Sequence, residues 1–431
     1  MGSSGVRRVA FASSAGNAVE LYDFLLYGTA SALVFDKLFF PSFDERIGTL
    51  LSLATFGVGF LARPLGGVVI GHFGDRVGRR AMLVVTLTVT GVCTALIGVL
   101  PTYSSVGLLA PVLLVLLRLV QGFFLGGEQG GATLMVVEHA PPDRAGWYGS
   151  WTFLGSPLGL LLASAAMSLS VSASGEDFLD WGWRVPFLVS LVLVGVGLYV
   201  RLSVQESPVF RETRAKGETV RLPIAEVLRG HWRRVLLGAG VNFGFNMFIF
   251  VLATFAASYG TKQLGMPRSV LLNATLVGSF AQAVAILVFA RLSDRVGRLP
   301  VMLGGAGFLA VFAFPLFWLL DTRQPGLVVL AMVIGFAGSA AIFGPMPAYY
   351  AELFGPKIRY TGVSVSYQLG AVLGGGLSPV VAAALLGLTA DHASWPVSLY
   401  LVGGALVSGL CVVAIGETIS GRARRPEPAE R

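Results

Sequence analysis

The sequence predicts an all-α membrane protein in which twelve transmembrane helices form two similar six-helix halves, with both chain termini in the cytoplasm. Three observations lead to this prediction. Hydrophobic residues make up 55% of the 431 positions and charged residues only 13%, about half the charged fraction of an average soluble domain. Apolar runs as long as a spanning helix, about 20 residues, recur along almost the whole chain. A short charged motif also occurs twice, once in each half.

The repeated motif is Asp-Arg-Val-Gly-Arg, which begins at Asp75 and again at Asp294. Each copy is a charged turn with a glycine, at which two apolar runs can reverse direction. The turns at 138–144 and 352–359 also match, because each places Glu at a helix end, Pro in the turn and Arg at the next helix start. Two six-span halves with matching turns indicate a parallel repeat about an axis along the membrane normal.

The apolar runs define the order of the elements. The expected spans are residues 10–39, 47–73, 81–101, 107–138, 146–171, 184–204, 234–260, 269–291, 300–320, 326–352, 359–388 and 394–416. They divide the chain into an N-terminal bundle at 1–205, a cytoplasmic linker at 206–233, a C-terminal bundle at 234–416 and a disordered tail at 417–431. The linker mixes Arg and Lys with Glu, and we expect it to form short amphipathic helices on the cytoplasmic face.

The distribution of charge sets the orientation and excludes several functions. Most of the 31 Lys and Arg residues fall in connections on the same side as the N-terminus, which places both termini in the cytoplasm. Because these residues are spread over short loops, the net charge of +8 reflects membrane topology and not a nucleic-acid partner. Cys93 and Cys411 lie in apolar runs without a second ligand nearby, and no nucleotide-binding or catalytic motif is present. We therefore expect no metal, no cofactor and no enzymatic activity.

Charged residues deep within the spans are the candidates for function. In the first span, Asn17, Glu20, Asp23 and Tyr27 share one helix face. Counting about 1.5 Å per residue places Glu20 and Asp23 about 15 to 20 Å deep, near the middle of an apolar core about 30 Å thick. Arg118 of the fourth span reaches the same depth from the other side. Because a charge at mid-membrane costs on the order of 2.5 kcal/mol or more, we expect these three charges to form a functional layer.

Two interpretations of this layer are open. It is either a fixed ion pair that holds spans one and four together, or a site that carries a proton. Two carboxylates face one guanidinium, so one acid lacks a partner and is suited to bind a proton reversibly. We expect Asp23 to be that acid and Glu20 its neighbour, although the sequence does not separate their roles. Arg118 can hold a carboxylate through two parallel hydrogen bonds, which suggests that it alternates between an acid of span one and a substrate.

Other polar residues extend the candidate site. Gln121 and Gln129 lie near the face of Arg118 and are expected to line the same cavity. Arg63 and Glu128 are expected to pair near the cytoplasmic ends of spans two and four, as a structural or gating pair or as a proton relay. The second half has no charge deep in any span, and its candidate substrate ligands are neutral or phenolic: Asn242, Asn246, Gln282, Tyr367 and Gln368. Polar packing between helices is an equal alternative for these residues.

The motif at 74–80, Gly-Asp-Arg-Val-Gly-Arg-Arg, resembles the signature turn of the major facilitator superfamily. The stretches at 16–24, Gly-Asn-Ala-Val-Glu-Leu-Tyr-Asp-Phe, and 118–128, Arg-Leu-Val-Gln-Gly-Phe-Phe-Leu-Gly-Gly-Glu, resemble its metabolite:proton symporter family. The resemblance implies import of a small carboxylate or zwitterion with protons as the coupling ion, across a bacterial-type cytoplasmic membrane and by a monomer. Proton-antiport efflux of a drug or secondary metabolite is the alternative, with which the aromatic residues of the second half are compatible.

The resemblance also assigns a cytoplasmic gate to the repeated motif. By the family pattern, Asp75 would hold the start of span eleven, favoured by the helix dipole, and Arg79 would reach Glu138. By symmetry, Asp294 would approach the start of span five and Arg298 would reach Glu352. The remaining residues assigned to this gate are Arg76, Arg144, Arg295 and Arg359. These contacts would exist only when the cytoplasmic side is closed, or they would be permanent ion pairs.

Small residues and prolines predict how the helices pack. Gly122 and Gly126 form a small-xxx-small pair, as do Gly370 and Gly374, and this spacing allows two helices to approach closely. Prolines in matching positions of spans five and eleven, at 157 and 379, predict kinks in both helices.

Overall fold

A computed structural model of the protein describes residues 3–42, 45–217, 222–388 and 393–423, and within these ranges it contains helices and turns but no strand. The elements of the first sequence half are α1 (Ser3–Ala30), η1 (Ser31–Phe35), α2 (Asp36–Phe39), α3 (Glu45–Arg76), α4 (Arg79–Val99), α5 (Tyr103–Val106), α6 (Leu109–His139), η2 (Pro142–Arg144), α7 (Ala145–Ser150), η3 (Trp151–Leu154), α8 (Gly155–Ser174), η4 (Gly175–Phe178) and α9 (Arg184–Leu202).

The linker contains two short helices, α10 (Pro208–Ala215) and α11 (Pro223–Gly230), as the sequence predicts. The elements that follow are α12 (Trp232–Phe250), η5 (Val251–Phe255), α13 (Ala256–Lys262), α14 (Arg268–Val296), α15 (Arg298–Asp321), α16 (Pro325–Phe343), α17 (Met346–Leu353), α18 (Arg359–Ala371), η6 (Val372–Gly376), α19 (Ser378–Leu386) and α20 (Trp395–Ala423).

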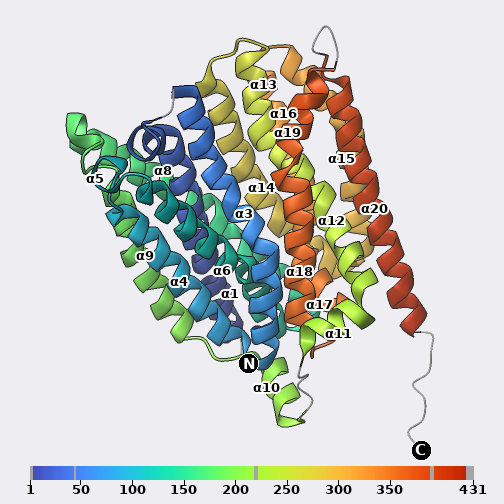
Figure 1. The fold of residues 1–431 in the computed structure, drawn as a ribbon. Coiled ribbons are helices and arrows are strands. Elements are labelled where there is room, and N and C mark those ends of the chain that lie inside the picture. The colour runs from blue at the N-terminus through green and yellow to red at the C-terminus, as the bar shows by residue number, and fades with distance from the viewer. Residues whose placement is uncertain (1–2, 43–44, 218–221, 389–392, 424–431) are drawn as a thin grey trace, which may run out of the picture. The chain divides into compact units, whose positions relative to one another are not determined.

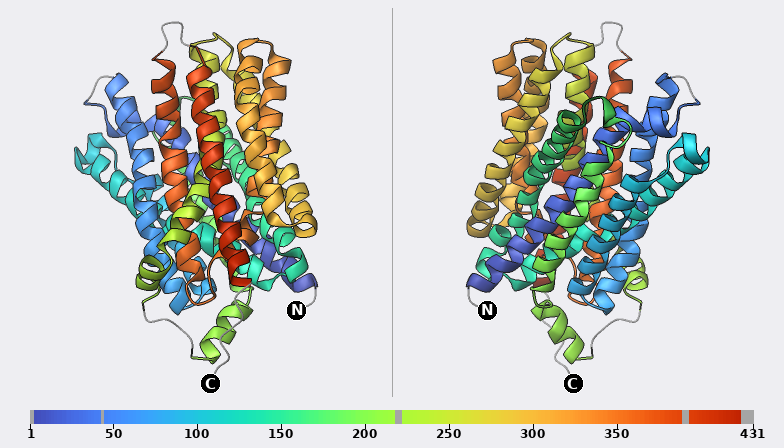
Figure 2. Two further views of the ribbon diagram at one scale, coloured as in Figure 1. Left: turned by 90° about the vertical axis from the view of Figure 1, so that its right-hand side faces the viewer. Right: turned by 90° about the vertical axis from the view of Figure 1, so that its left-hand side faces the viewer.

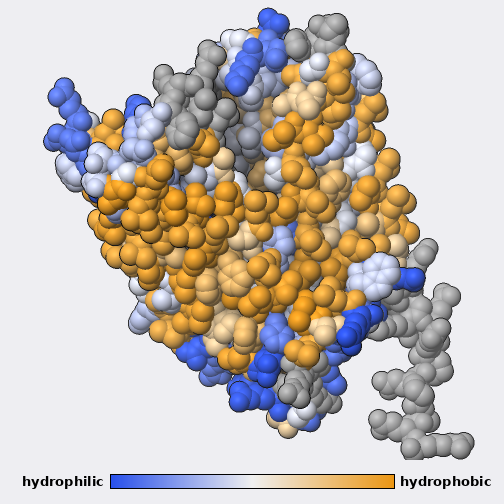
Figure 3. Space-filling model, viewed as in Figure 1, coloured by the Kyte–Doolittle hydropathy of each residue, from blue (hydrophilic) through white to orange (hydrophobic). Residues whose placement is uncertain are grey.

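The length and hydropathy of the helices are those of a multi-pass membrane protein. Within the described ranges, ten segments from α4 to α20 are long and apolar enough to cross a membrane. The first two expected spans correspond to α1 and α3, which are not among these ten, so the total of twelve stays a prediction. Figure 3 shows apolar side chains along the long helices and hydrophilic side chains gathered at their ends.

The helices divide into two compact units. The first comprises Met1–Ala140, Trp151–Ile224 and Pro356–Val365, and the second comprises Pro141–Ser150, Ala225–Gly355 and Ser366–Arg431. Within the first unit α1, α3, α4, α6 and α9 run side by side, and within the second α12, α14, α15, α16 and α20 do so (Figures 1 and 2). The starts of α7 and α18 each pack with helices of the other sequence half. The two compact units therefore do not divide at the linker alone. α7 and the start of α18 each group with the other sequence half, because carboxylates of that half bind their first N–H groups.

The helices are irregular where the sequence places the prolines that predict kinks, and the kinks themselves stay a prediction. A 3-10 segment, η3, lies just before Pro157, and a π-helical segment, η6, lies just before Pro379. Proline has no N–H to donate and its ring clashes with the carbonyl four residues earlier, which in each case lies inside the irregular segment. Two further π-helical segments, η1 and η5, lie at matching positions in the first and seventh expected spans. Such segments often occur at functional sites.

The end of the last helix differs from the prediction. The sequence predicts disorder from residue 417, but α20 continues to Ala423. The helix can extend because the first proline of this region stands at position 426 and nothing before it removes a backbone donor. The predicted disorder at 424–431 lies outside the described residues.

Glycines bring neighbouring helices into close contact, as the sequence predicts. A Cβ added at Gly122 or Gly126 of α6 would collide with the backbone of α3, at Gly59 and Arg63 respectively. In the second unit, a Cβ at Gly370 would approach the backbone of Ala239 and one at Gly374 would collide with that of Phe243, both on α12. These positions allow van der Waals contact between backbones.

We predict that Gly126→Val destabilises the protein by roughly 1–3 kcal/mol, the usual cost of an extra side chain in a packed interior. The thermal midpoint of the detergent-solubilised protein measures this effect. Gly195→Val is the matched control, because Gly195 of α9 is exposed and has no heavy atom within 4 Å of an added Cβ. Equal midpoints for the two variants would contradict the role of Gly126 in packing.

Candidate functional site

Six charged side chains of the first unit, four of them buried and two partly buried, form one cluster. It consists of Glu20 and Asp23 of α1, Arg63 of α3, Arg118 and Glu128 of α6, and Arg201 of α9, which we call the buried charge cluster. Electrostatic interactions connect Glu20 with Glu128, Arg63 and Arg201, and connect Arg118 with Asp23 and Arg63. The cluster holds three acids and three bases, and such pairing reduces the cost of burying charge.

Arg118 is held in a fixed orientation within this cluster. It is 1% exposed, and its guanidinium donates to Gln121 Oε1 at 2.6 Å and lies 4.2 Å from the ring centre of Tyr27. Gln121 in turn donates to Thr94 of α4 at 2.7 Å. A side chain at Gly59 of α3 would collide with the guanidinium. The arginine is thus oriented by an amide, an aromatic face and a glycine, an arrangement that suits recognition of a planar carboxylate.

Asp23, like Glu20, has a buried carboxylate oxygen that lacks a hydrogen-bond partner among the described residues. It is 1% exposed, and neither carboxylate oxygen has a hydrogen-bond partner among the described residues. Thr94 and Arg118 face it, but the Thr94 hydroxyl already donates to the Thr90 carbonyl at 3.0 Å. A buried carboxylate without donors is costly in its charged form, so binding a proton removes that cost.

The ion-pair partner of Glu128 differs from the prediction. We expected Glu128 to pair with Arg63, but its ion pair is with Arg201 of α9, and Thr86 of α4 also donates to it. Arg201 is 4% exposed and donates further to the Leu83 carbonyl at 2.6 Å. Gly16 of α1 leaves the space that the Arg201 guanidinium occupies, since an added Cβ there would collide with it.

Arg63 takes a different position from the one predicted. Its guanidinium lies over the rings of Phe60 and Phe24, at 4.6 Å and 5.2 Å from their centres, and it interacts electrostatically with Glu20. These contacts place Arg63 between the two ends of the cluster. It therefore contributes positive charge near the acids of α1.

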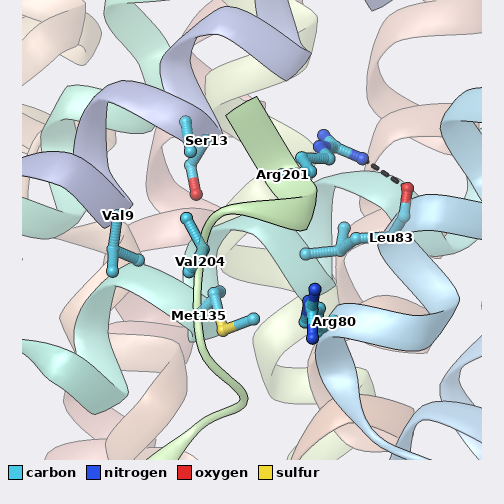
Figure 4. A pocket seen from close by; sticks show the side chains of 8 residues that line it. Val9, Ser13, Arg80, Leu83, Met135, Arg201 and Val204 are labelled. Carbon is cyan, nitrogen blue, oxygen red and sulfur yellow. Dashed lines mark hydrogen bonds between the residues drawn. The ribbon is translucent and has the colours of Figure 1, made fainter. Parts of the chain in front are cut away.

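A small pocket borders the Arg201 end of the cluster. It has a volume of about 10 Å³, close to the minimum for one water molecule. Figure 4 shows Arg201 reaching the Leu83 carbonyl at its edge, with Arg80 near by. The other lining residues are Val9, Ala12, Ser13, Met135 and Val204.

Several predicted substrate ligands already have internal partners. In the first unit, Asn17 donates to Ser156 at 3.0 Å and Tyr27 to Thr55 at 2.7 Å. Gln129 is 9% exposed, and its side-chain nitrogen has no hydrogen-bond partner among the residues that the structure describes. Gln129 therefore retains a donor for a ligand, and Gln121 is committed to Arg118.

The predicted ligands of the second unit mainly join helices. Asn242 donates to the Tyr367 carbonyl at 2.7 Å, and Asn246 donates to the Asn242 side chain at 2.7 Å. Gln282 donates to Ser339 at 2.9 Å, and Gln368 is 2% exposed. These contacts favour the alternative of polar packing for Asn242 and Gln282 in the conformation seen.

The first copy of the motif makes both contacts that the resemblance implies. Asp75 accepts hydrogen bonds from the backbone N–H groups of Tyr360 and Thr361 at 3.1 Å and 2.9 Å, and from the Thr361 hydroxyl at 2.8 Å. Arg79 lies 3.3 Å from Glu138 and also donates to the Pro356 carbonyl at 3.2 Å. Asp75 thus caps the start of α18, where the helix dipole favours a negative charge.

The linker packs on the turn of this first copy. The sequence alone does not reveal this contact. Glu206 accepts hydrogen bonds from the backbone N–H groups of Arg79 and Arg80 at 3.1 Å each. Phe210 of α10 is buried beneath the Arg79 guanidinium, 5.1 Å from it. Gly78 has a φ of 127°, and a Cβ there would collide with Glu206. Only glycine combines this backbone conformation with so close an approach.

The second copy makes the corresponding contacts in a more exposed setting. Asp294 accepts hydrogen bonds from the backbone N–H groups of Gly146 and Trp147, both at 2.8 Å, and so holds the start of α7. Arg298 pairs with Glu352 at 2.5 Å. The Glu352 side chain is 47% exposed, whereas that of Glu138 is 1% exposed. An exposed ion pair contributes little to stability, so the two copies differ in strength.

The other arginines assigned to the gate occupy different environments. Arg359 reaches Glu138 at 3.2 Å, which gives this acid two basic partners. Arg76 and Arg295 are exposed, and Arg144 forms only an exposed pair with its neighbour Asp143 at 3.5 Å. These last three residues make no contact across the motif among the described residues.

Long apolar helices that bury ion pairs, and charged turns whose carboxylates bind the starts of other helices, are features of membrane transport proteins. The comparisons with known proteins agree. The family model of the Major Facilitator Superfamily matches residues 25–379 and 279–431, and the chain belongs to this superfamily. It is a multi-pass membrane transporter of metabolites and not an enzyme.

Two curated relatives and one solved structure illustrate the match. The chain is 41% identical to the shikimate transporter of Escherichia coli (strain K12), covering 96% of this chain and 95% of that protein. It is 33% identical to the proline/betaine transporter of the same organism, covering 98% and 86% respectively. The proton:xylose symporter XylE bound to 6-bromo-6-deoxy-D-glucose shares the fold, with a TM-score of 0.72, 17% identity, and coverage of 98% and 96%.

We predict that Asp75→Asn weakens the cap of α18 and raises amide hydrogen exchange in peptides covering 356–365. Asparagine retains one acceptor oxygen and loses the charge, and the loss of a helix cap costs about 0.5–2 kcal/mol. Asp294→Asn is a reciprocal control, which should raise exchange at 145–150 and leave 356–365 unchanged. If either variant changed both segments equally, or neither segment, the capping assignment would be wrong.

Proposed function

We propose that this transporter is a proton-coupled symporter that imports a small organic acid or zwitterion by alternating access. The observation that carries the proposal is Asp23, a buried acid without hydrogen-bond donors beside an oriented arginine. In this mechanism Asp23 binds a proton when the substrate carboxylate takes over Arg118. The release of the substrate restores the attraction between Arg118 and Asp23, and the proton then leaves.

The chemistry of the relatives supports a carboxylate at Arg118. Shikimate, proline and betaine, which the names of two relatives give as their cargo, all carry a carboxylate group. A guanidinium forms two parallel hydrogen bonds with such a group. Gln129, with an available donor, would add a neutral contact, and Tyr367 and Gln368 would contact uncharged parts of the substrate. The other predicted ligands would act indirectly, through the groups to which they are hydrogen-bonded: Asn17, Tyr27, Asn242, Asn246 and Gln282.

The helix caps supply the conformational change in this proposal. Asp75 and Asp294 hold the starts of α18 and α7 in the structure. We assign these contacts to the state that is closed on the cytoplasmic side, and their release to the inward-open state. The protein would work as a monomer in a bacterial-type cytoplasmic membrane, with protons as the coupling ion and no other cofactor.

We predict that proteoliposomes with an inward proton gradient accumulate labelled shikimate, proline or betaine, and that an uncoupler abolishes this accumulation. Uptake should rise as the external pH falls, because the proton is a co-substrate. Asp23→Asn should reduce accumulation to the equilibrium level while exchange of labelled for unlabelled substrate continues, since exchange requires no net movement of protons. Asp180→Asn, at an exposed position, is the matched control and should behave as the wild type.

Two results would count against this proposal. Full accumulation by Asp23→Asn would show that Asp23 does not carry the proton. Proton-driven export of an apolar cation, with no carboxylate uptake by the wild type, would instead support an efflux antiporter.

We predict that Arg118→Lys weakens substrate binding roughly tenfold or more, because a hydrogen bond to a charged group contributes about 1.5–3 kcal/mol and lysine cannot form the planar, paired arrangement. The apparent KM for uptake and the shift in thermal midpoint with substrate measure this effect. Arg233→Lys, at an exposed cytoplasmic position, is the control. Wild-type transport by Arg118→Lys would remove Arg118 from the substrate site.

A further inference from the structure

An apolar groove lies on the second unit and shares no residue with the buried charge cluster of the first. It has a volume of about 670 Å³, and all its lining residues are apolar. The groove lies between α14 and α15, and α16 forms its floor, because both helices pack closely against α16 and little against each other. Gly304 of α15 keeps it open, since no heavy atom lies within 4 Å of a Cβ added there.

The depth of the groove matches one leaflet of a bilayer. Along α15 it extends from Pro300, close to the turn between α14 and α15, to Phe308. The eight helical rises between them correspond to about 12 Å of helix, close to half of an apolar core about 30 Å thick. On α16 the groove reaches Val333, in the middle of that helix. The groove thus spans the leaflet on the side of the motif turn, which is the predicted cytoplasmic side.

Two arginines border the groove at its motif end. Arg291 and Arg295 alternate along α14 with the groove residues Leu292 and Val296, and they line a polar pocket of about 350 Å³. Neither arginine has a carboxylate partner among the residues that the structure describes. Arg291 lies 5.9 Å from the ring centre of Trp147, and Arg295 is exposed.

The acids of this pocket are already engaged. Asp294 accepts two backbone hydrogen bonds from the start of α7, and Asp143 pairs with Arg144 at 3.5 Å. The pocket therefore presents two arginines without ion-pair partners beside an apolar groove of leaflet depth. A phosphate joined to a hydrocarbon chain has the complementary chemistry, because basic pockets on the cytoplasmic side of membrane helices attract anionic headgroups.

We propose that this groove is a binding site for an anionic phospholipid of the cytoplasmic leaflet, with an acyl chain between α14 and α15 and the phosphate at Arg291 and Arg295. The site is separate from the substrate site, and the proposal does not depend on the nature of the transported molecule. A bound lipid would support α14 close to Asp294, the residue that holds the start of α7.

The test measures retention of phosphatidylglycerol and of phosphatidylcholine with identical chains by native mass spectrometry of the purified full-length protein. The wild type should retain phosphatidylglycerol in preference to phosphatidylcholine. The double variant Arg291→Gln/Arg295→Gln should bind it roughly 25-fold more weakly, because each basic residue at an anionic surface contributes about a fivefold factor. Arg229→Gln, at an exposed position on α11, should bind it as the wild type does.

Filling the groove provides the second arm. Gly304→Leu should displace the acyl chain and reduce retention, whereas Gly307→Leu, on the same helix with equally open space but outside the groove, should not. Ala337→Leu fills the groove from α16 and replaces Gly304→Leu if that variant does not fold. Three results would overturn the proposal. They are equal retention of the two lipids by the wild type, equal lipid retention by Gly304→Leu and Gly307→Leu, and displacement of the lipid by inorganic phosphate at equal concentration.

Discussion

Each turn of the repeated motif uses one carboxylate to bind the start of a helix from the other sequence half. The first N–H groups of a helix have no partner within it, and Asp75 and Asp294 each accept two of them. This interaction decides which helix starts belong to which compact unit. It is also local and reversible, since a shift of about one hydrogen-bond length leaves those N–H groups unpaired. A transporter needs such contacts where it must hold one state without being trapped in it.

The two copies of the repeat have the same contacts but unequal environments. Around the first copy, the Arg79 and Glu138 side chains are each 1% exposed, and Glu206 and Phe210 of the linker region pack on the same turn. Around the second, Glu352 is largely open to solvent. A buried ion pair is costly to break because it leaves an unpaired charge, whereas an exposed pair separates easily. The two copies of the motif are therefore similar in sequence but differ in the free energy needed to break their contacts.

Local residue types were sufficient to predict the glycine contacts and the irregular helix segments at the prolines, because each depends on a short stretch of chain. The helix caps join residues far apart in the chain, and their prediction came from the family resemblance. The partner of Glu128 was not predictable in this way, since Arg201 stands at the end of a span where arginine normally reaches water. One signal was present: Ser190, Gly197 and Arg201 lie on one buried face of α9 at helical spacing. Whether a long side chain turns inward depends on space provided by another helix, which spacing along α9 does not reveal.

That space is provided by Gly16 of α1, where any side chain would collide with the Arg201 guanidinium. The consequence is a genetic one. A larger residue at position 16 requires the Arg201 guanidinium to move or to be lost, and either change disturbs its ion pair with Glu128. The three positions are therefore expected to be epistatic, so that single changes are deleterious and viable alternatives require coordinated substitutions on three different helices.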